Sequence, residues 1–420
     1  MTRLIDQRAF ALTMLMSSLA LLVMASGLLS SLLGVRAHLE GFDVEHIGMM
    51  GAAYFGGYVL ASLKAPAIVS TIGNIRTFAG FAALASVSSL AHLFWISPLS
   101  WFLLRAATGF CYAGMIIVVE GWINGTASKT NRGRFLAVYS IIFTGAWALS
   151  QQLLNVGDVE GFRTFILVGI LFSLALVPIT LGRTVEPGVI SVKRISIRRL
   201  YDLSPVGMAG ALVSGACAGA FIGLGPVFAS HLSRGAAGVS LFMSITILGA
   251  IVMHGPVGIL SDRFDRRKVM IGVSCASVLA SFTAVLFFSM PFGAFLFLGF
   301  VFGGATFSLY ALSAAHVNDH IELSELVPTA GQLILLYGFG AMAGPFLTGL
   351  IMGWTGPQGL FVFIGMTELM LVVFCLYRLP MRLPVPQEQK KAFVHIPRTS
   401  HTILELLRKH YDVFHRKSRP

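Results

Sequence analysis

The sequence predicts an all-α integral membrane protein with twelve transmembrane helices, and three observations support this fold class. Hydrophobic residues make up 56% of the 420 residues and charged residues only 11%, with a mean hydropathy of +0.81, which leaves too little polar surface for a soluble globule. Apolar runs of about 20 residues, long enough to cross a bilayer as a helix, recur along the chain. Basic residues lie mostly between these runs, so membrane orientation explains the formal charge of +12 better than nucleic-acid binding does.

The apolar runs form two sets of six predicted spans. The first run, residues 10–33, is uncharged and too long for the apolar region of a cleaved signal peptide, so we expect it to remain as a helix. The other spans of the first set are predicted at 46–69, 76–96, 99–123, 133–155 and 161–182. The second set is predicted at 205–230, 238–260, 268–290, 291–316, 327–353 and 358–378. The expected domains are therefore 1–182, a polar linker at 183–204, 205–379, and a tail at 380–420.

Lysine and arginine residues predict an orientation in the cytoplasmic (inner) membrane with both termini in the cytoplasm. In this orientation only Arg36, Arg163 and Arg234 lie outside. The other basic residues between spans lie inside, as the positive-inside rule requires: Arg3, Arg8, Arg76, Lys129, Arg132, Arg134, the linker 183–204, the loop 263–268 and the tail.

The tail after Arg378 is predicted to be a separate basic segment. Prolines at positions 380, 384 and 386 prevent the last span from continuing. Thr402-Ile-Leu-Glu405 reads as a capping box, and apolar residues follow it at helical spacing. We expect a short amphipathic helix that rests on anionic membrane lipids.

One stretch, residues 255–268, combines a glycine-containing span end with six charged residues. Gly255 and Gly258 allow a neighbouring helix to approach closely, and the charges that follow cannot enter hydrocarbon cheaply. The order Gly258-x-x-x-Asp262-Arg263-x-x-Arg266-Arg267 closely resembles the loop signature of the major facilitator superfamily of transporters. A simpler reading is a stop signal and turn between two spans.

Two more features support this resemblance. Arg105-Ala-Ala-Thr-Gly109 is similar to the Arg-x-x-x-Gly element in the family's fourth span. The segment 66–76 keeps Gly73 and Arg76 of the loop signature but lacks its acidic residue, so the two halves look related and unequal. The resemblance implies two pseudo-symmetric six-helix bundles. It also implies a secondary active transporter that moves a small solute by alternating access, coupled to a proton or solute gradient.

Polar residues inside the predicted spans are candidates for substrate binding or coupling, because charge in hydrocarbon normally faces a cavity or a partner. Arg105 is a candidate anion-binding or proton-coupling group, or else an ion pair that braces helices. Glu368 is a candidate coupling site or a packing partner, and His254 a titrating group or a helix–helix hydrogen bond. The remaining candidates, each also readable as an interhelical contact, are Tyr54, Tyr58, Gln151, Tyr310, Gln332 and Tyr337.

The loop signature also suggests a cytoplasmic gate. An acidic stretch with Asp319, Glu322 and Glu325 precedes the eleventh span and breaks the positive-inside pattern. We expect Asp262 to meet the start of that span, and the basic loop to pair with the acidic stretch, when the protein faces outward. These contacts are expected to separate when it opens inward. The alternative is a solvated loop that obeys topology rules alone.

Other classes of function find little support in the sequence. The four cysteines lie inside apolar runs and form no closely spaced pair, so neither a disulfide framework nor a metal site is predicted. No Walker-type run appears, and the short loops contain no His-x-x-His, catalytic carboxylate pair or nucleophile elbow, so we expect no enzyme and no cofactor. The expected partners are a small-molecule substrate, membrane lipids and a coupling proton, with the protein a monomer. The alternative is a polytopic membrane sensor or membrane enzyme without transport.

Overall fold

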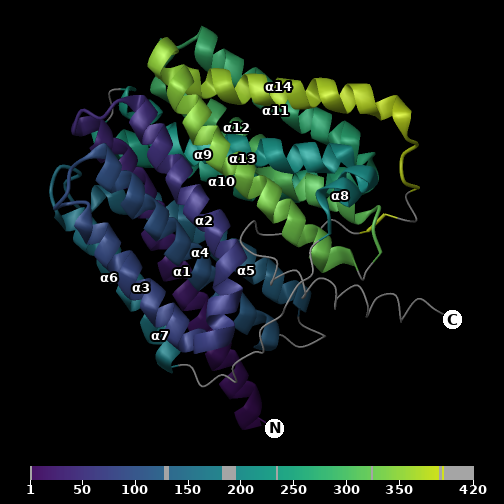
Figure 1. Ribbon diagram of the computed structural model, residues 1–420. Coiled ribbons are helices and arrows are strands. Elements are labelled where there is room, and N and C mark those ends of the chain that lie inside the picture. Colours follow the sequence, from purple (N-terminus) through teal and green to yellow (C-terminus); the bar gives the residue numbers. More distant parts are fainter. Residues whose placement is uncertain are drawn as a thin grey trace.

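A computed structural model describes residues 2–126, 132–181, 195–232, 235–322, 325–386 and 390–391, and the regular structure in these ranges is helical throughout (Figure 1). The helices are α1 (Thr2–Leu39), α2 (Val44–Ile72), α3 (Asn74–Ala91), α4 (Pro98–Thr126), α5 (Arg132–Gln152), α6 (Arg163–Leu174), α7 (Leu176–Leu181), α8 (Ile197–Leu203), α9 (Pro205–Ser230), α10 (Gly235–Arg263), α11 (Arg266–Leu286), α12 (Phe292–Asn318), α13 (Leu326–Thr355) and α14 (Gly359–Arg378). Short 3-10 turns follow α5 at Leu153–Asn155 and α14 at Leu379–Met381.

Ten helical stretches in the described residues are long and apolar enough to cross a membrane, with α6 and α7 together forming one of them. The predicted spans at 76–96 and 133–155 coincide with α3 and α5, which are not among the ten. The sequence of α3 explains its omission, because Asn74 and Arg76 lie in its first turn and lower its hydropathy. The all-helical membrane class is therefore confirmed, with ten apolar helices in the part of the chain that the structure describes.

Side-chain capping explains where two of the helices next to the loop 263–268 and the linker begin. Ser204 caps α9, because its hydroxyl accepts a hydrogen bond from the Gly207 N–H at 3.1 Å and Pro205 occupies the first turn. Asp265 caps α11 in the same way, accepting from the Arg267 N–H at 3.0 Å. The chain between α10 and α11 is thus reduced to a tight corner.

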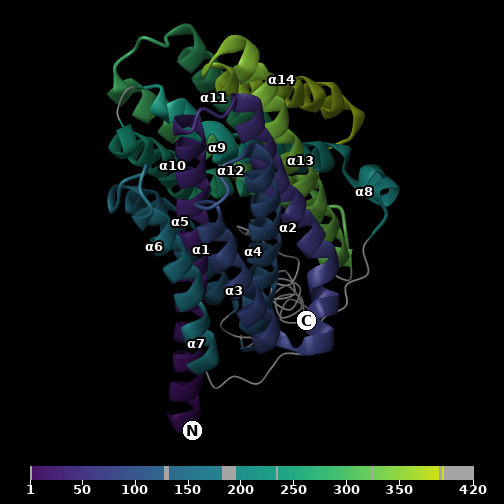
Figure 2. The same cartoon turned by 60° about the vertical axis from the view of Figure 1, so that its left-hand side comes forward.

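We call residues 2–181 the N-terminal half and residues 195–391 the C-terminal half. The helices of each half gather on their own side of the molecule (Figures 1 and 2). Each half contains a helix pair in which glycines bring two backbones together. A Cβ on Gly57 of α2 would collide with the Ala106 carbonyl of α4, and one on Gly109 would collide with the Tyr54 carbonyl. Gly249 of α10 and Gly303 of α12 meet the Phe300 and Thr246 carbonyls in the same manner. The α2–α4 pair and the α10–α12 pair therefore pack alike.

Contacts between the two halves concentrate at one end, called here the closed end, which contains the α1–α2 turn. Gly34 faces Pro226, and the backbones of Gly48 and Gly349 lie against each other. Hydrogen bonds add to this packing: the Asn155 amide donates to the Ser240 hydroxyl at 2.8 Å, and the Gln152 amide donates to the Ser244 hydroxyl at 2.7 Å. Small residues and side-chain hydrogen bonds therefore hold the halves together at this end.

Candidate functional site

A cavity of about 140 Å³ lies between the two halves. Its wall is mainly aromatic and hydroxyl-bearing, with residues from α1, α2, α4 and α5 on one side and from α9, α10, α12 and α13 on the other: Val23, Ser26, Gly27, Ser30, Tyr54, Phe55, Tyr58, Tyr112, Ser140, Phe143, Thr144, Trp147, Ile222, Ala250, His254, Phe307, Tyr337 and Gly338. Both halves meet directly across it, because the rings of Trp147 and Phe307 pack edge to face at 5.4 Å. A concave, largely apolar pocket with a few polar groups is the usual form of a small-molecule site.

Arg105 lies behind this wall and is 4% exposed. Its guanidinium carbon is 4.3 Å from the centre of the Tyr54 ring, and its Nη2 donates to the Ser30 hydroxyl at 3.3 Å. Both contacted residues line the cavity. The Nη1 atom is buried and makes no hydrogen bond with any described residue. The ion pair that was predicted as the alternative role of Arg105 is not formed among the described residues.

The structure places the other predicted binding or coupling residues in three different settings. Tyr54, Tyr58, His254 and Tyr337 line the cavity, and the Tyr54 hydroxyl is hydrogen-bonded to Ser26 at 2.8 Å. Tyr310 packs edge to face on Tyr337 at 5.2 Å, one layer behind the wall. Gln151 accepts a hydrogen bond from Ser31 inside the N-terminal half, and Gln332 is buried in α13.

Glu368 belongs to a separate buried cluster inside the C-terminal half. Its Oε1 accepts a hydrogen bond from Thr306 at 2.7 Å, and Thr306 is 2.8 Å from the Ser277 hydroxyl. These residues lie on α14, α12 and α11 and do not line the cavity described above. This placement fits the packing interpretation of Glu368 better than a role at the substrate.

Several cavity residues were not predicted from the sequence: Ser26, Ser30, Tyr112, Ser140, Phe143, Thr144, Trp147 and Phe307. The hydroxyl groups of Ser26, Ser30, Ser140 and Thr144 in otherwise apolar runs were the available signal. The aromatic residues gave none, because a ring facing lipid and a ring facing a cavity look the same in an apolar run.

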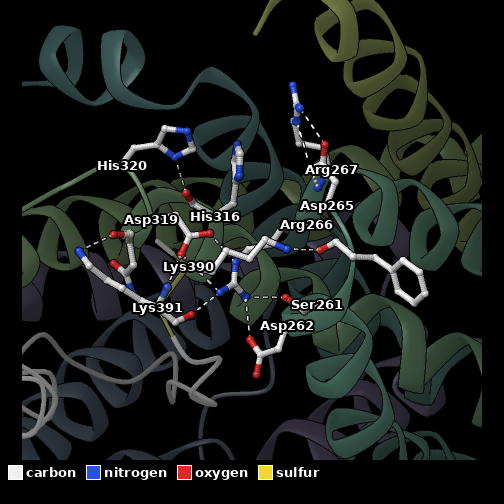
Figure 3. A network of polar contacts seen from close by, with 12 residues as sticks. Ser261, Asp262, Asp265, Arg266, Arg267, His316, Asp319, His320, Lys390 and Lys391 are labelled. Carbon is white, nitrogen blue, oxygen red and sulfur yellow. Dashed lines mark hydrogen bonds and ion pairs between the residues drawn. The ribbon is translucent and has the colours of Figure 1, made fainter. Parts of the chain in front are cut away.

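The corner between α10 and α11 is the centre of a second polar site, the loop network, shown in Figure 3. Arg266 forms an ion pair with Asp319 at the end of α12, with 2.7 Å between Nε and Oδ2. Its Nη1 donates to the Ser261 hydroxyl at 2.6 Å and lies 3.5 Å from Asp262. It also donates to the backbone carbonyl of Lys391 in the tail. One arginine thus ties α10, α12 and the tail together.

The neighbouring Arg267 connects the same corner to the end of α14. It pairs with Asp265 at 2.7 Å and donates to the carbonyls of Leu379 and Arg382 at 3.1 and 2.9 Å. Burial alone would raise the pKa of Asp265, but the hydrogen bonds and charge of Arg267 outweigh it, so the net pKa lies below its usual value. The carboxylate is therefore ionised at neutral pH and the pair is charged.

Lys391 completes the loop network from the tail. Its ammonium donates to the carbonyl of Asn318, the last residue of α12, at 2.7 Å and to that of Ile321, three residues further along, at 2.5 Å. Its backbone N–H donates to Asp319 at 3.0 Å. Burial lowers the pKa of Lys391, while the charge of Asp319 opposes that change. The tail was predicted to rest on lipid, and this docking was not predicted. The amphipathic helix predicted from Thr402 onwards lies outside the described residues.

The remaining predicted gate residues lie around this network. Gly258 is buried in α10, whereas Arg263 and Glu322 are exposed. Glu325 pairs with Arg199 of α8 at 3.3 Å. All the ion pairs named here join parts of the C-terminal half.

Comparisons with known proteins agree with this architecture. Residues 207–414 match the family model described as Major Facilitator Superfamily. The "Uncharacterized MFS-type transporter YcaD" of Escherichia coli O17:K52:H18 (strain UMN026 / ExPEC) is 26% identical over 358 residues, covering 84% of this chain and 91% of the relative. Its counterpart from Escherichia fergusonii is 25% identical over 354 residues, with the same coverage.

Two solved structures show a similar fold. The nucleoside transporter NupG superposes with a TM-score of 0.73 at 15% identity, over 88% of this chain and 99% of that one. A bacterial homologue of the human lysosomal transporter Spinster, in an inward-facing and occupied conformation, gives 0.71 at 15% identity, over 92% and 99%. The helical fold is therefore shared with solved membrane transport proteins. The chain belongs to the major facilitator superfamily.

Proposed function

We propose that this protein is a secondary active transporter that moves a small solute across the cytoplasmic membrane by alternating access. The observation that carries this proposal is the cavity, whose wall comes from both halves, next to a closed end held by contacts between them. A solute held at such an interface gains access to either side when the halves rock against each other. A proton or solute gradient is the proposed driving force.

The proposal includes twelve spans in two pseudo-symmetric six-helix bundles, with α3 and α5 crossing the membrane beside the ten more apolar helices. The matching glycine contacts of α2–α4 and α10–α12 support this duplication. Lysine and arginine distribution supports cytoplasmic termini, and in that orientation the closed end faces outside. A reporter joined after Ser191 tests the orientation, and activity that requires an external location would contradict it.

In this orientation, a closed outer end corresponds to a state that opens towards the cytoplasm. The Arg266–Asp319 pair is formed in that state and lies within one half. We therefore propose that this pair braces the C-terminal half, instead of separating on inward opening as the sequence-based hypothesis expected. Asp262, 45% exposed, stays the candidate for a contact that changes between states.

Transport itself is tested with purified protein in liposomes. Protein-containing and empty liposomes are incubated with a metabolite mixture, with and without an imposed proton gradient, and internal solutes are measured by mass spectrometry. We expect at least one solute to accumulate only in the protein-containing liposomes. If none does in either condition, the transporter proposal fails.

Alternating access is tested by fixing the closed end. In a background without native cysteines, N155C/S240C places thiols where the two side chains now hydrogen-bond across the halves. Cross-linking this pair should stop transport, and reduction should restore it. S86C/S173C is the matched control, because these serines lie 3.0 Å apart within the N-terminal half. Full transport by the cross-linked N155C/S240C protein would contradict the mechanism.

A further inference from the structure

Arg105 is a buried cation without an anionic partner among the described residues. An arginine side chain stays protonated in proteins, so this charge cannot be removed by loss of a proton. Taking such a charge out of water is costly unless an opposite charge or strong acceptors compensate it. The Tyr54 ring and the Ser30 hydroxyl supply only weak compensation, and Nη1 has no acceptor. The site is electrostatically incomplete as it stands.

Two carboxylates of the same half, Glu120 and Glu40, do not complete it. Glu120 lies fifteen positions further along α4, roughly 22 Å away at 1.5 Å per residue, and accepts a hydrogen bond from Tyr139. Glu40 is occupied by Arg36, with 2.5 Å between Nη2 and Oε1. None of the ion pairs formed by the described residues includes Arg105. The described residues therefore supply no ion-paired counter-charge for Arg105, whereas a bound anion can.

The cavity in front of Arg105 indicates what else that molecule carries. Aromatic rings from both halves, including Tyr54, Trp147, Phe307 and Tyr337, give it flat apolar walls. Hydroxyl groups of Ser26, Ser30, Ser140 and Thr144 offer hydrogen bonds on the N-terminal side. A flat apolar body with one negatively charged end matches these walls and the guanidinium behind them.

We propose that the cavity binds a small aromatic monocarboxylate, or an organic anion of the same chemistry, whose negative group is countered by Arg105. This inference rests on the proposed transport function and names the substrate class for the same cavity. The competing explanation is that Arg105 only braces α4 against α1 and α2 through Ser30 and Tyr54. The two explanations predict different ligand selectivity. An anion-binding Arg105 makes the cavity prefer anionic over neutral ligands, whereas an Arg105 that only braces helices does not.

Trp147 provides a direct readout, because it lines the cavity and its fluorescence responds to a ligand beside it. Purified full-length protein in detergent is titrated with benzoate, phenylacetate and 4-hydroxybenzoate, and with the neutral isostere benzyl alcohol. W147F identifies the part of the signal that comes from the cavity. We expect saturable quenching by a carboxylate, with benzyl alcohol binding at least about tenfold more weakly, as loss of a charge-assisted hydrogen bond implies.

Variants of Arg105 separate anion binding from bracing. R105Q should weaken carboxylate binding about tenfold or more and abolish the preference over benzyl alcohol, whereas R105K should keep part of both. R36Q is the matched control: it removes a guanidinium from the same half that is already paired with Glu40, so binding should not change. Gel-filtration profiles and unfolding temperatures identify any variant that fails to fold.

Four results would overturn the inference: equal binding of benzyl alcohol and the carboxylates, undiminished selectivity in folded R105Q, the same quenching by chloride alone, or no binding by any of the three carboxylates. Accumulation of a neutral solute in liposomes together with any of these would leave the transport proposal standing. Arg105-dependent carboxylate binding without accumulation of any solute would leave the anion site standing and remove transport.

Discussion

Arg266 and Asp319 form an ion pair in which both side chains are withdrawn from solvent, with 1% and 2% of their surfaces exposed. The pair spans 53 residues of sequence and joins the corner after α10 to the end of α12. Each partner also forms a hydrogen bond with the backbone of Lys391 in the tail, so both charged groups have more than one polar partner. Such a pair destabilises the protein strongly when one member is removed alone.

We predict that D319N lowers the free energy of unfolding by about 3–5 kcal/mol, because it leaves Arg266 buried without its counter-charge. The unfolding temperature of purified protein measures this loss. E325Q is the control: it removes one member of the exposed Arg199–Glu325 pair, and should cost about 1 kcal/mol or less. Similar effects of the two variants would show that burial of the Arg266–Asp319 pair has no energetic consequence.

Removing the Lys391 ammonium should also weaken the loop network. In K391Q the carbonyls of Asn318 and Ile321 lose a charged donor, which we expect to cost about 1–3 kcal/mol. K268Q is the matched control, because it removes the same charge from Lys268, which is exposed at the start of α11. Its unfolding midpoint should stay close to that of the wild type. Thermal unfolding compares the two; an unchanged midpoint in K391Q would mean that the tail contributes nothing to holding α12.

Acidification should destabilise the protein through His320. Burial lowers its pKa below the usual 6.5, and the charges of Arg382 and Arg267 act in the same direction. The unfolded chain therefore binds this proton more readily than the folded one, so stability is retained above pH 6.5 and falls as the pH drops below it. H320Q should show a smaller loss between pH 7.5 and 5.5 in thermal unfolding. Parallel pH profiles of H320Q and wild type would refute this.

Alanine substitution of two glycines, Gly57 in α2 and Gly80 in α3, should have opposite effects on stability. G57A places a Cβ against the Ala106 carbonyl, so α2 and α4 must separate, and we expect reduced yield and a lower unfolding temperature. G80A in α3 adds a Cβ where no atom lies within 4 Å, and should be neutral or stabilising by up to about 1 kcal/mol. Equal stability of the two proteins would mean that the close approach of α2 and α4 is not required.

The helical segments and four residues of the cavity wall were predictable from the sequence. Runs of apolar residues fix where helices cross a membrane, and Tyr54, Tyr58, His254 and Tyr337 were detectable because polar atoms are expensive there. The rotation of each helix was not predictable, since its lipid-facing and protein-facing sides are both apolar. Trp147 and Phe307 were missed for this reason, although they join the two halves across the cavity.

The loop network shows a different limit. The charge pattern predicted that the basic loop, which includes Arg266, pairs with the acidic stretch, which includes Asp319, and it did not single out this one pair. The docking of Lys391 was not predictable, because a basic tail in a membrane protein is expected to meet lipid headgroups. Lys391 instead donates to the backbone carbonyls of Asn318 and Ile321, and a sequence does not show where backbone carbonyls will point.

The uncompensated charge of Arg105 has an electrical consequence. A cation that never loses its proton feels the potential across the membrane wherever the surrounding dielectric is low, at about 2.3 kcal/mol per elementary charge for every 100 mV crossed. Any rearrangement that shifts the guanidinium along the membrane normal while the cavity is empty therefore moves charge and is biased by voltage. If a monoanion binds Arg105 as proposed, it cancels this charge, so we expect voltage to act on the guanidinium in the empty protein more than in the loaded one.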